Sequence, residues 1–371
     1  GKTLVALRAM LAVVDSGGQA VLLAPTEVLA SQHHRSVVAL LGPLAERGLL
    51  GGSDLGTRVV LLTGSMSAAR RRETLLDVGV GDAGIVIGTH ALLEDRVQFF
   101  DLGLVVVDEQ HRFGVEQRAA LAAKSRHDTR PHVLVMTATP IPRTVAMTVF
   151  GDLEVSTLTE LPAGRSPIIT HVVPALERPA FLDRAWGRIV EEVAAGRQAY
   201  VVCPRIGGDE AAADDDVEAA APTADEVEEK RRPPVAVLDV APMLAAGPLS
   251  AVRVGMLHGR MAPDDKDDVM RRFAAGPAAP DGIDVLVATT VIEVGVDVPN
   301  AAVMVVMDAE RFGVSQLHQL RGRVGRGSHP GLCLLVTDAV EAAPARERLD
   351  AVAATTDGFE LSRLDLEQRR E

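Results

Sequence analysis

Two adjacent carboxylates, Asp108 and Glu109, follow the apolar run Leu102–Val107. Such a run is typical of a strand buried in a parallel sheet, and open α/β sheets bind ligands at the carboxyl ends of their strands. At that place Asp108 could hold the Mg²⁺ of a nucleotide, and Glu109 could orient and deprotonate the attacking water. Taken alone, the pair is also explained as acidic residues that end a strand in solvent.

The first three residues, Gly1-Lys2-Thr3, open a helical pattern and resemble the end of a phosphate loop. Backbone N–H groups and the helix dipole would face an anionic phosphate there, with Lys2 on the β and γ oxygens and Thr3 on Mg²⁺. A match of three residues arises easily by chance, and an ordinary exposed helix start explains it too. Together with Asp108 and Glu109 about a hundred residues later, it predicts a nucleotide hydrolase.

A second group of polar residues is expected at the same sheet edge. Thr137 and Thr139 end an apolar run just before Pro140, and Gln110 and His111 follow the acidic pair. These side chains could sense the state of the nucleotide and couple it to movement. A strand end with a proline stop explains the threonines equally well.

The segment Gln316–Gly327 places Gln319, Arg321, Arg323 and Arg326 on a helix interrupted by glycines. A guanidinium is always charged and binds developing phosphoryl charge through two hydrogen bonds, which is the role of an arginine finger. A solvated basic face is the alternative, but the glycines would destabilise an ordinary surface helix.

Polar residues also follow the apolar run that ends at Ala288. Thr289, Thr290 and Glu293 could face a nucleic acid, while Gly295 and Asp297 could approach the nucleotide, with Asp297 reaching the ribose. The segment is therefore interpreted as a link between two binding sites.

Composition constrains these interpretations without deciding them. The net charge is −13, but ten acids against three bases between Asp209 and Arg232 supply more than half of it, so a nucleic-acid site must be a local groove. The chain has 2 cysteines without C-x-x-C spacing, no secretory signal and no apolar run of membrane-spanning length. The pattern favours a cytoplasmic protein, and no histidine, including the adjacent His33 and His34, has zinc-ligand spacing with the cysteines.

Alternating apolar runs and amphipathic stretches predict two consecutive α/β domains with mostly parallel sheets. Domain 1 is expected over residues 1–150, a linker over 151–167, and domain 2 over 168–345 with a disordered acidic insertion at 207–234. Residues 346–371 begin a C-terminal helical region. The strands predicted for domain 1 are 20–24, 59–63, 85–89, 102–108 and 133–139, with helices over 4–14, 27–41 and 68–78.

The second series of strands is predicted over 168–173, 198–203, 252–257, 285–289, 303–307 and 332–337. Helices over 180–195, 263–273 and 315–322 fill the gaps. A cleft between two such domains is the place where a ligand is expected.

These motifs together resemble a superfamily 2 helicase core, which has two tandem RecA-like domains of the P-loop NTPase class. The resemblance rests on Pro25–Leu29, Thr63–Ser65, Gly88–Leu92, Asp108–Val115, Thr137–Thr144, Thr289–Asn300 and Gln316–Gly327. It implies ATP and Mg²⁺ as cofactors. It also implies nucleic-acid contacts at Thr26, Glu27, Thr63, Gly64, Thr89, His90, Thr289 and Thr290.

Within that superfamily, the sequences of three stretches are similar to those of the RecG family. The Mfd family of transcription-repair coupling translocases is the nearest alternative. The stretches begin at Asp108, Val291 and Asp308. The resemblance implies an ATP-driven motor on double-stranded DNA that reverses stalled forks and migrates Holliday junctions. It implies branched DNA as the partner, with single-stranded DNA-binding protein as a further candidate, a monomeric state and no membrane.

In the RecG family a separate N-terminal wedge domain reads the junction, and no such domain precedes Gly1, so the chain is expected to be the motor alone. An RNA helicase with the same motor, and a nucleic-acid-binding fragment without turnover, remain open alternatives.

Overall fold

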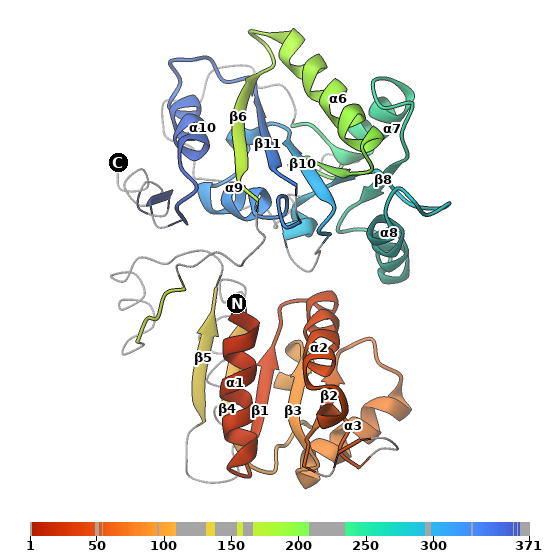
Figure 1. Cartoon of the computed structure of the whole chain (residues 1–371), viewed down its shortest axis with the longest axis vertical. Helices are drawn as coiled ribbons and strands as arrows, with labels where there is room; N and C mark the ends of the chain where they lie inside the picture. The colour runs from red at the N-terminus through yellow and green to blue at the C-terminus, as the bar shows by residue number, and fades with distance from the viewer. Residues whose placement is uncertain are drawn as a thin grey trace. The chain divides into compact units, whose positions relative to one another are not determined.

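A computed structural model describes residues 2–48, 52–53, 55–94, 96–108, 131–137, 154–158, 166–207, 234–293, 298–327, 329–358, 360–361 and 363. These residues fall into two compact units. The first holds the described residues up to Thr137 together with 157–158, and the second holds 154–156 and the residues from Ser166 onward. Each unit is an α/β structure built on one sheet, as the sequence predicts (Figure 1).

The first unit contains a five-stranded parallel sheet in the order β2-β3-β1-β4-β5. Its strands are β1 Gln19–Leu23, β2 Arg58–Leu62, β3 Ala83–Gly88, β4 Leu102–Asp108 and β5 His132–Met136. Its helices are α1 Lys2–Asp15, α2 Glu27–Leu41 and α3 Ala68–Val80, with short 3-10 turns η1 Gly42–Ala45 and η2 His90–Leu93.

Burial explains why these strands are continuous apolar runs. Every residue of β1 and β3 is buried, because helices cover both faces of the sheet. Ala20 and Leu22 pack with α1 and α2 on one face, whereas Val21 and Leu23 pack with Val78 of α3 and with the segment that follows η2 on the other.

The second unit contains a six-stranded parallel sheet in the order β6-β11-β10-β7-β9-β8. The strands are β6 Ile168–Pro174, β7 Gln198–Val202, β8 Val254–Leu257, β9 Val285–Ala288, β10 Ala301–Val306 and β11 Gly331–Thr337. The helices are α6 Pro179–Ala194, α7 Val237–Ala246, α8 Pro263–Ala275, α9 Val314–Arg321 and α10 Pro344–Ala354, with 3-10 turns η4 Thr290–Glu293 and η5 Ala309–Arg311.

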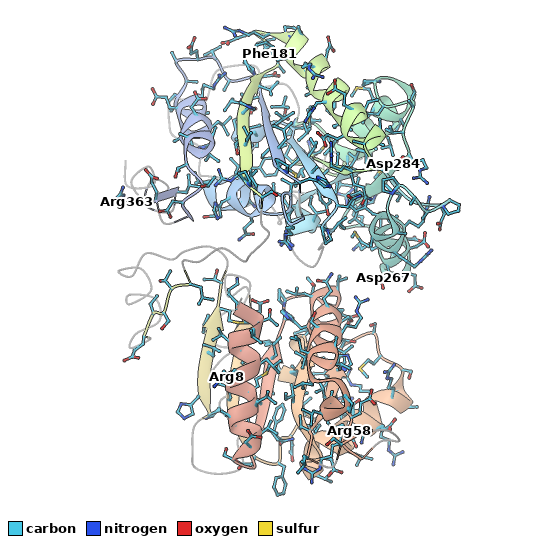
Figure 2. All side chains as sticks on the ribbon, in the orientation of Figure 1. Arg8, Arg58, Phe181, Asp267, Asp284 and Arg363 are labelled. Carbon is cyan, nitrogen blue, oxygen red and sulfur yellow. The ribbon has the colours of Figure 1, made fainter. Side chains whose placement is uncertain are left out.

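Helices again cover both faces of this sheet. Residues of α8, α9 and α10 share one core cluster, in which the rings of Tyr200 and Phe273 lie 5.0 Å apart, and residues of α6 and α7 share the other. Side chains fill the space between the helices and the sheet in each unit (Figure 2).

In each sheet, one central strand begins with a buried glutamine that forms hydrogen bonds to backbone groups. Gln19 begins β1 and Gln198 begins β7, both are almost fully buried, and both amide groups donate to backbone carbonyls of neighbouring segments. Each follows a helix by a short turn with a glycine at positive φ, Gly17 and Gly196. These hydrogen bonds connect the start of the central strand to segments that precede or begin a neighbouring strand.

Most predicted elements are present with shifts of one or two residues at their ends, and α2 and β4 have their predicted bounds. Helix α7 is not predicted from the sequence. It contains Pro242, and proline is normally excluded from the interior of a helix. The predicted domain boundary at residue 150, most of the linker 151–167 and nearly all of the insertion 207–234 lie outside the described residues. No helix among the described residues is long and apolar enough to cross a membrane.

Candidate functional site

The carboxyl edge of the first sheet gathers the residues predicted to hold phosphate. The chain leaves α1, reverses direction at Ser16–Gly18 and enters β1, so α1 is antiparallel to the strands. The start of α1, with Lys2 and Thr3, therefore lies at the carboxyl edge of the sheet (Figure 1). Both side chains are half-buried. The helix start and the carboxyl ends of β1 and β4 therefore share one edge of the sheet.

Asp108 is the last residue of β4, and its side chain is almost entirely buried at this edge. Its Oδ2 lies 2.8 Å from Nε2 of His33, which is buried on α2. In the sequence His33 stands out only as one of two adjacent histidines. The spacing from the helix start at Glu27 places it nearly two turns along α2, but nothing in the sequence identifies its partner 75 residues away.

These residues fit a magnesium nucleotide. A buried carboxylate supplies the hard oxygen that Mg²⁺ prefers, and a helix start that carries a lysine and a threonine supplies positive charge and a hydroxyl for phosphate. The other residues selected for this side of the site are Gly1, Glu109, Gln110, His111 and Thr139, and they lie outside the described residues. Thr137 is described and is half-buried just after β5.

Two of the segments predicted to contact nucleic acid are tied together by hydrogen bonds. Thr26 caps α2 by accepting a hydrogen bond from the backbone N–H of Leu29, at 3.3 Å. The carboxylate of Glu27 accepts hydrogen bonds from the backbone N–H of Ser65, at 3.0 Å, and from its hydroxyl. The start of α2 and the turn after β2 therefore form one connected surface element.

The predicted contact residues of this unit differ in exposure. Gly64 and His90 are exposed and Thr26 is half-buried, whereas Thr63 is 4% and Thr89 1% exposed. A threonine that ends a strand packs inward when its β-branched side chain continues the core. In this conformation the groups available to a ligand are the exposed residues beside the buried threonines.

At the carboxyl edge of the second sheet, the predicted contact residues whose side chains are described are buried. Thr289 and Thr290 are both buried at the end of β9, the side chain of Glu293 is not described, and Gly295 and Asp297 lie outside the described residues. The backbone N–H of Thr289 donates to the carbonyl of Leu257, so the ends of β9 and β8 are joined.

The basic loop that follows β8 is not part of any of the predicted motifs. Arg260 is exposed there and donates to the carbonyl of Gly207, and Lys266 donates to the carbonyl of Gly259 at 2.6 Å. Burial lowers the pKa of His258, and the charges of Lys266 and Arg260 lower it further. The signal available in the sequence was the run His258-Gly259-Arg260 directly after a strand.

The arginines around α9 have different surroundings. Arg321 is buried and donates to the carbonyls of Val352 and Thr355, both at 2.7 Å, and to Nδ1 of His318 at 3.0 Å, and burial lowers its pKa. These hydrogen bonds hold α9 against the end of α10, so the role of Arg321 in this conformation is structural. Arg326 is exposed, with its Nε donating to the carbonyl of Gly322 at 2.9 Å.

Arg323 and Gln319 are half-buried on the same segment. The positive φ of Gly325, +69°, turns the chain between the two remaining arginines, which a residue with a Cβ would resist.

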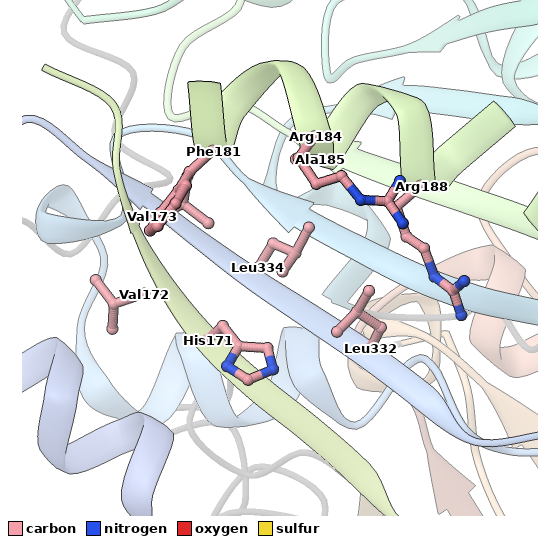
Figure 3. Close-up of a pocket in the computed structure, with 9 residues that line it drawn as sticks. All are labelled: His171, Val172, Val173, Phe181, Arg184, Ala185, Arg188, Leu332 and Leu334. Carbon is pink, nitrogen blue, oxygen red and sulfur yellow. The ribbon is translucent and has the colours of Figure 1, made fainter. Parts of the chain in front are cut away.

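A groove of about 350 Å³ lies between β6 and α6 in the second unit (Figure 3). Its lining is mostly apolar, with Arg184 and Arg188 on the helix side, and these arginines pair with Glu191. Phe181, labelled in Figure 2, lines the groove from the exposed start of α6. The groove includes none of the residues that the motifs select.

Among the described residues no group of three or more His, Cys, Asp or Glu side chains could hold a metal ion by itself. Magnesium is commonly bound by one or two carboxylates together with the phosphates of its substrate, and Asp108 is a carboxylate placed for that role.

Comparison with known families agrees with the motifs. Residues 1–148 match the DEAD/DEAH box helicase family, and residues 235–328 match the helicase conserved C-terminal domain. All of this chain aligns with the ATP-dependent DNA helicase RecG of Mycobacterium tuberculosis strain H37Rv at 57% identity, and with that of Bacillus subtilis at 45%. The chain covers 48% of each, so it spans about half the length of these curated relatives.

Solved structures give the same fold. The structure of RecG bound to a three-way DNA junction matches 99% of this chain and 42% of the other, with a TM-score of 0.71 and 36% identity. Yeast Dbp5 bound to RNA and ADP BeF3 matches with a TM-score of 0.59 at 15% identity, which is evidence for the fold alone. The two units are the tandem RecA-like domains of a helicase core.

Proposed function

Since the chain belongs to the RecG family of superfamily 2 helicases, we propose that it is the ATP-driven motor of an enzyme that moves on double-stranded DNA and remodels branched DNA. Reversal of stalled forks and branch migration of Holliday junctions are the proposed reactions, in recombination and repair. The observation that carries the proposal is the match over 99% of the chain to a RecG structure bound to a three-way DNA junction.

The nucleotide is ATP with Mg²⁺, held at the carboxyl edge of the first sheet. Gly1 and Lys2 bind the phosphates, and Thr3 and Asp108 hold the metal, while Gly295 and Asp297 contact the nucleotide. Bound Mg²⁺ neutralises charge on the phosphate oxygens. The support is the shared edge of α1 and β4, with Asp108 almost fully buried.

Hydrolysis is assigned to residues of both units. Glu109 orients the attacking water and accepts its proton, because it follows the metal-binding carboxylate directly in the chain. Arg323 and Arg326 stabilise the charge that develops on the transferred phosphoryl group, with Gln319 beside them. Support for Arg326 is its exposure, which leaves the guanidinium accessible to a ligand.

DNA contacts are assigned to the segments that carry Thr26, Gly64 and His90 in the first unit and Thr289 and Thr290 in the second. Because Thr63 and Thr89 are buried, we assign the phosphate contacts of the first unit to Gly64 and His90, the exposed residues next to them. Glu27 acts through Ser65, since its carboxylate accepts two hydrogen bonds from that residue. Gln110, His111, Thr137 and Thr139 couple the two ligands.

The domain assignment is part of the proposal. Residues 1–150 form the ATP-binding domain, 151–167 the linker and 168–345 the second domain, and 346–371 begin the C-terminal region of the motor. We further propose a monomer that acts in the cytoplasm and works with single-stranded DNA-binding protein.

Stimulation of ATP hydrolysis by nucleic acid tests this function. The chain, extended to the length of its relatives, is assayed with forked DNA, linear duplex DNA and duplex RNA. Forked DNA is expected to raise kcat at least tenfold over the nucleic-acid-free rate, and RNA to have no effect. Stronger stimulation by RNA would identify an RNA helicase, and binding without turnover would reduce the chain to a nucleic-acid-binding protein.

A further inference from the structure

The contact between His33 and Asp108 joins α2, whose start is a predicted nucleic-acid segment, to the carboxylate predicted to bind Mg²⁺. Their 2.8 Å separation is within the range of a charge-assisted hydrogen bond, and the two side chains are 8% and 7% exposed. A carboxylate buried to this extent needs a partner, because unpaired burial of a charge is costly. His33 is a buried partner of Oδ2.

The direction of this hydrogen bond follows from the chemistry of the two groups. A carboxylate that binds Mg²⁺ is ionised and only accepts hydrogen bonds, so in the metal-binding state Nε2 of His33 is the donor to Oδ2 of Asp108. The bond restricts rotation of the carboxylate about its last torsion. Partners that orient a metal-binding carboxylate in this way typically change metal affinity or activity 10- to 100-fold when they are removed.

Helix α2 places His33 at a defined distance from the predicted DNA side. The helix is 15 residues long, is capped by Thr26 and begins with Glu27, whose carboxylate holds Ser65. His33 is six residues further along, which at 1.5 Å per residue is about 9 Å. A shift of the helix start when DNA binds would therefore be transmitted to the carboxylate through a rigid element.

We propose that His33 is a positioning residue that holds Asp108 in its metal-binding orientation and, through α2, makes that orientation depend on DNA bound at the start of the helix. This rests on the proposed function. It adds a residue that acts on the nucleotide site through another side chain and does not touch the nucleotide itself.

Three variants in the chain extended to the length of its relatives test the role. His33→Ala removes the donor, and His33→Gln keeps an N–H near the position of Nε2. His34→Ala is the matched control, because His34 is the next residue on the same helix and its Nε2 lies 3.4 Å from the carbonyl of Val59, away from Asp108. Thermal unfolding of each variant sets an assay temperature at which all are folded.

The first readout is the Mg²⁺ concentration that gives half-maximal binding of a fluorescent ATP analogue, which needs no turnover. His33→Ala is expected to raise it about 10-fold, with His33→Gln within about threefold of the original protein and His34→Ala unchanged. An unchanged Mg²⁺ midpoint in His33→Ala, whether or not its melting temperature falls, would overturn the positioning role.

The second readout is the ratio of kcat with forked DNA to kcat without it, at saturating Mg²⁺ and ATP. His33→Ala is expected to lower this ratio about 10-fold while KM for ATP and the affinity for the fork stay within twofold. An unchanged ratio overturns the coupling through α2. If the unsubstituted protein itself shows no DNA stimulation, the proposed function fails, and the binding readout still decides whether His33 positions Asp108.

Discussion

Replacement of Gln19 by methionine should destabilise the first unit strongly, although the residue lies away from the ligand edge. The Gln19 amide donates to the carbonyls of Val78 and Ala83, at 3.0 and 2.7 Å. Its Oε1 accepts from the backbone N–H groups of Phe100 and Asp101, at 2.7 and 3.1 Å. These bonds fix the start of β1 against the starts of β3 and β4, the strand that ends at Asp108.

The expected cost follows from the number of bonds lost. Methionine has nearly the length of glutamine, so the substitution removes four hydrogen bonds and creates little cavity. At about 1 kcal/mol net per bond the free energy of unfolding falls by about 4 kcal/mol, out of about 5 to 15 for a domain.

Gln198 is the matched position in the second unit. Its amide donates to the carbonyls of Phe273 and Ile283, and its Oε1 accepts no hydrogen bond from the described part of the chain. Gln198→Met should therefore cost about 2 kcal/mol by the same rule.

Urea unfolding can separate the two units. Trp186 is the single tryptophan of the chain and is buried in the second unit, so its fluorescence reports that unit, whereas far-UV circular dichroism reports both. With a slope of about 2 kcal/mol per M, Gln19→Met should move the first unit's transition by about 2 M. The fluorescence transition should stay in place in Gln19→Met and move by about 1 M in Gln198→Met. Equal costs at the two positions, or a cost at Gln19 below about 1 kcal/mol, would refute the reasoning.

Three further predictions concern catalysis and the thiols. Glu109→Gln should abolish ATP hydrolysis and keep nucleotide binding, and near-normal turnover would remove the assignment. Arg326→Ala should lower kcat about 10³-fold, whereas a loss of ATP affinity alone would contradict the finger role. Burial raises the pKa of Cys333 to about 12 and also raises that of Cys203. Both thiols should therefore resist a disulfide reagent at pH 8 until the chain is unfolded, and fast labelling of the folded protein would show that they are accessible.

The sequence predicts elements best where local signals agree. Apolar residues at helical spacing predict α2 with its observed bounds. The start of β1 was predicted one residue late, because glutamine is normally exposed and Gln19 is buried by hydrogen bonds to segments far away in the chain. Helix α7 is not predicted because Pro242 is a strong local signal against a helix. Contacts of the helix with the core stabilise it despite the proline.

The same distinction applies to the site. Asp108 was predictable because a run of apolar residues ends at it, and this is a local pattern. Its contact with His33 was not, because the helix and the strand that carry the two residues meet only in the folded sheet. The burial of Thr63, Thr89, Thr289 and Thr290 likewise depends on packing, which no spacing in the sequence encodes.

Branch migration of a synthetic Holliday junction tests the proposed motor function most directly. The chain, extended to the length of its relatives, is incubated with a labelled junction and ATP, with a non-hydrolysable ATP analogue in the control, and the products are separated by gel electrophoresis. We expect conversion of the junction to duplex products that needs ATP hydrolysis and is lost in Glu109→Gln. Conversion that proceeds equally with the analogue, or an intact junction despite ATP hydrolysis stimulated by DNA, would contradict the proposed function.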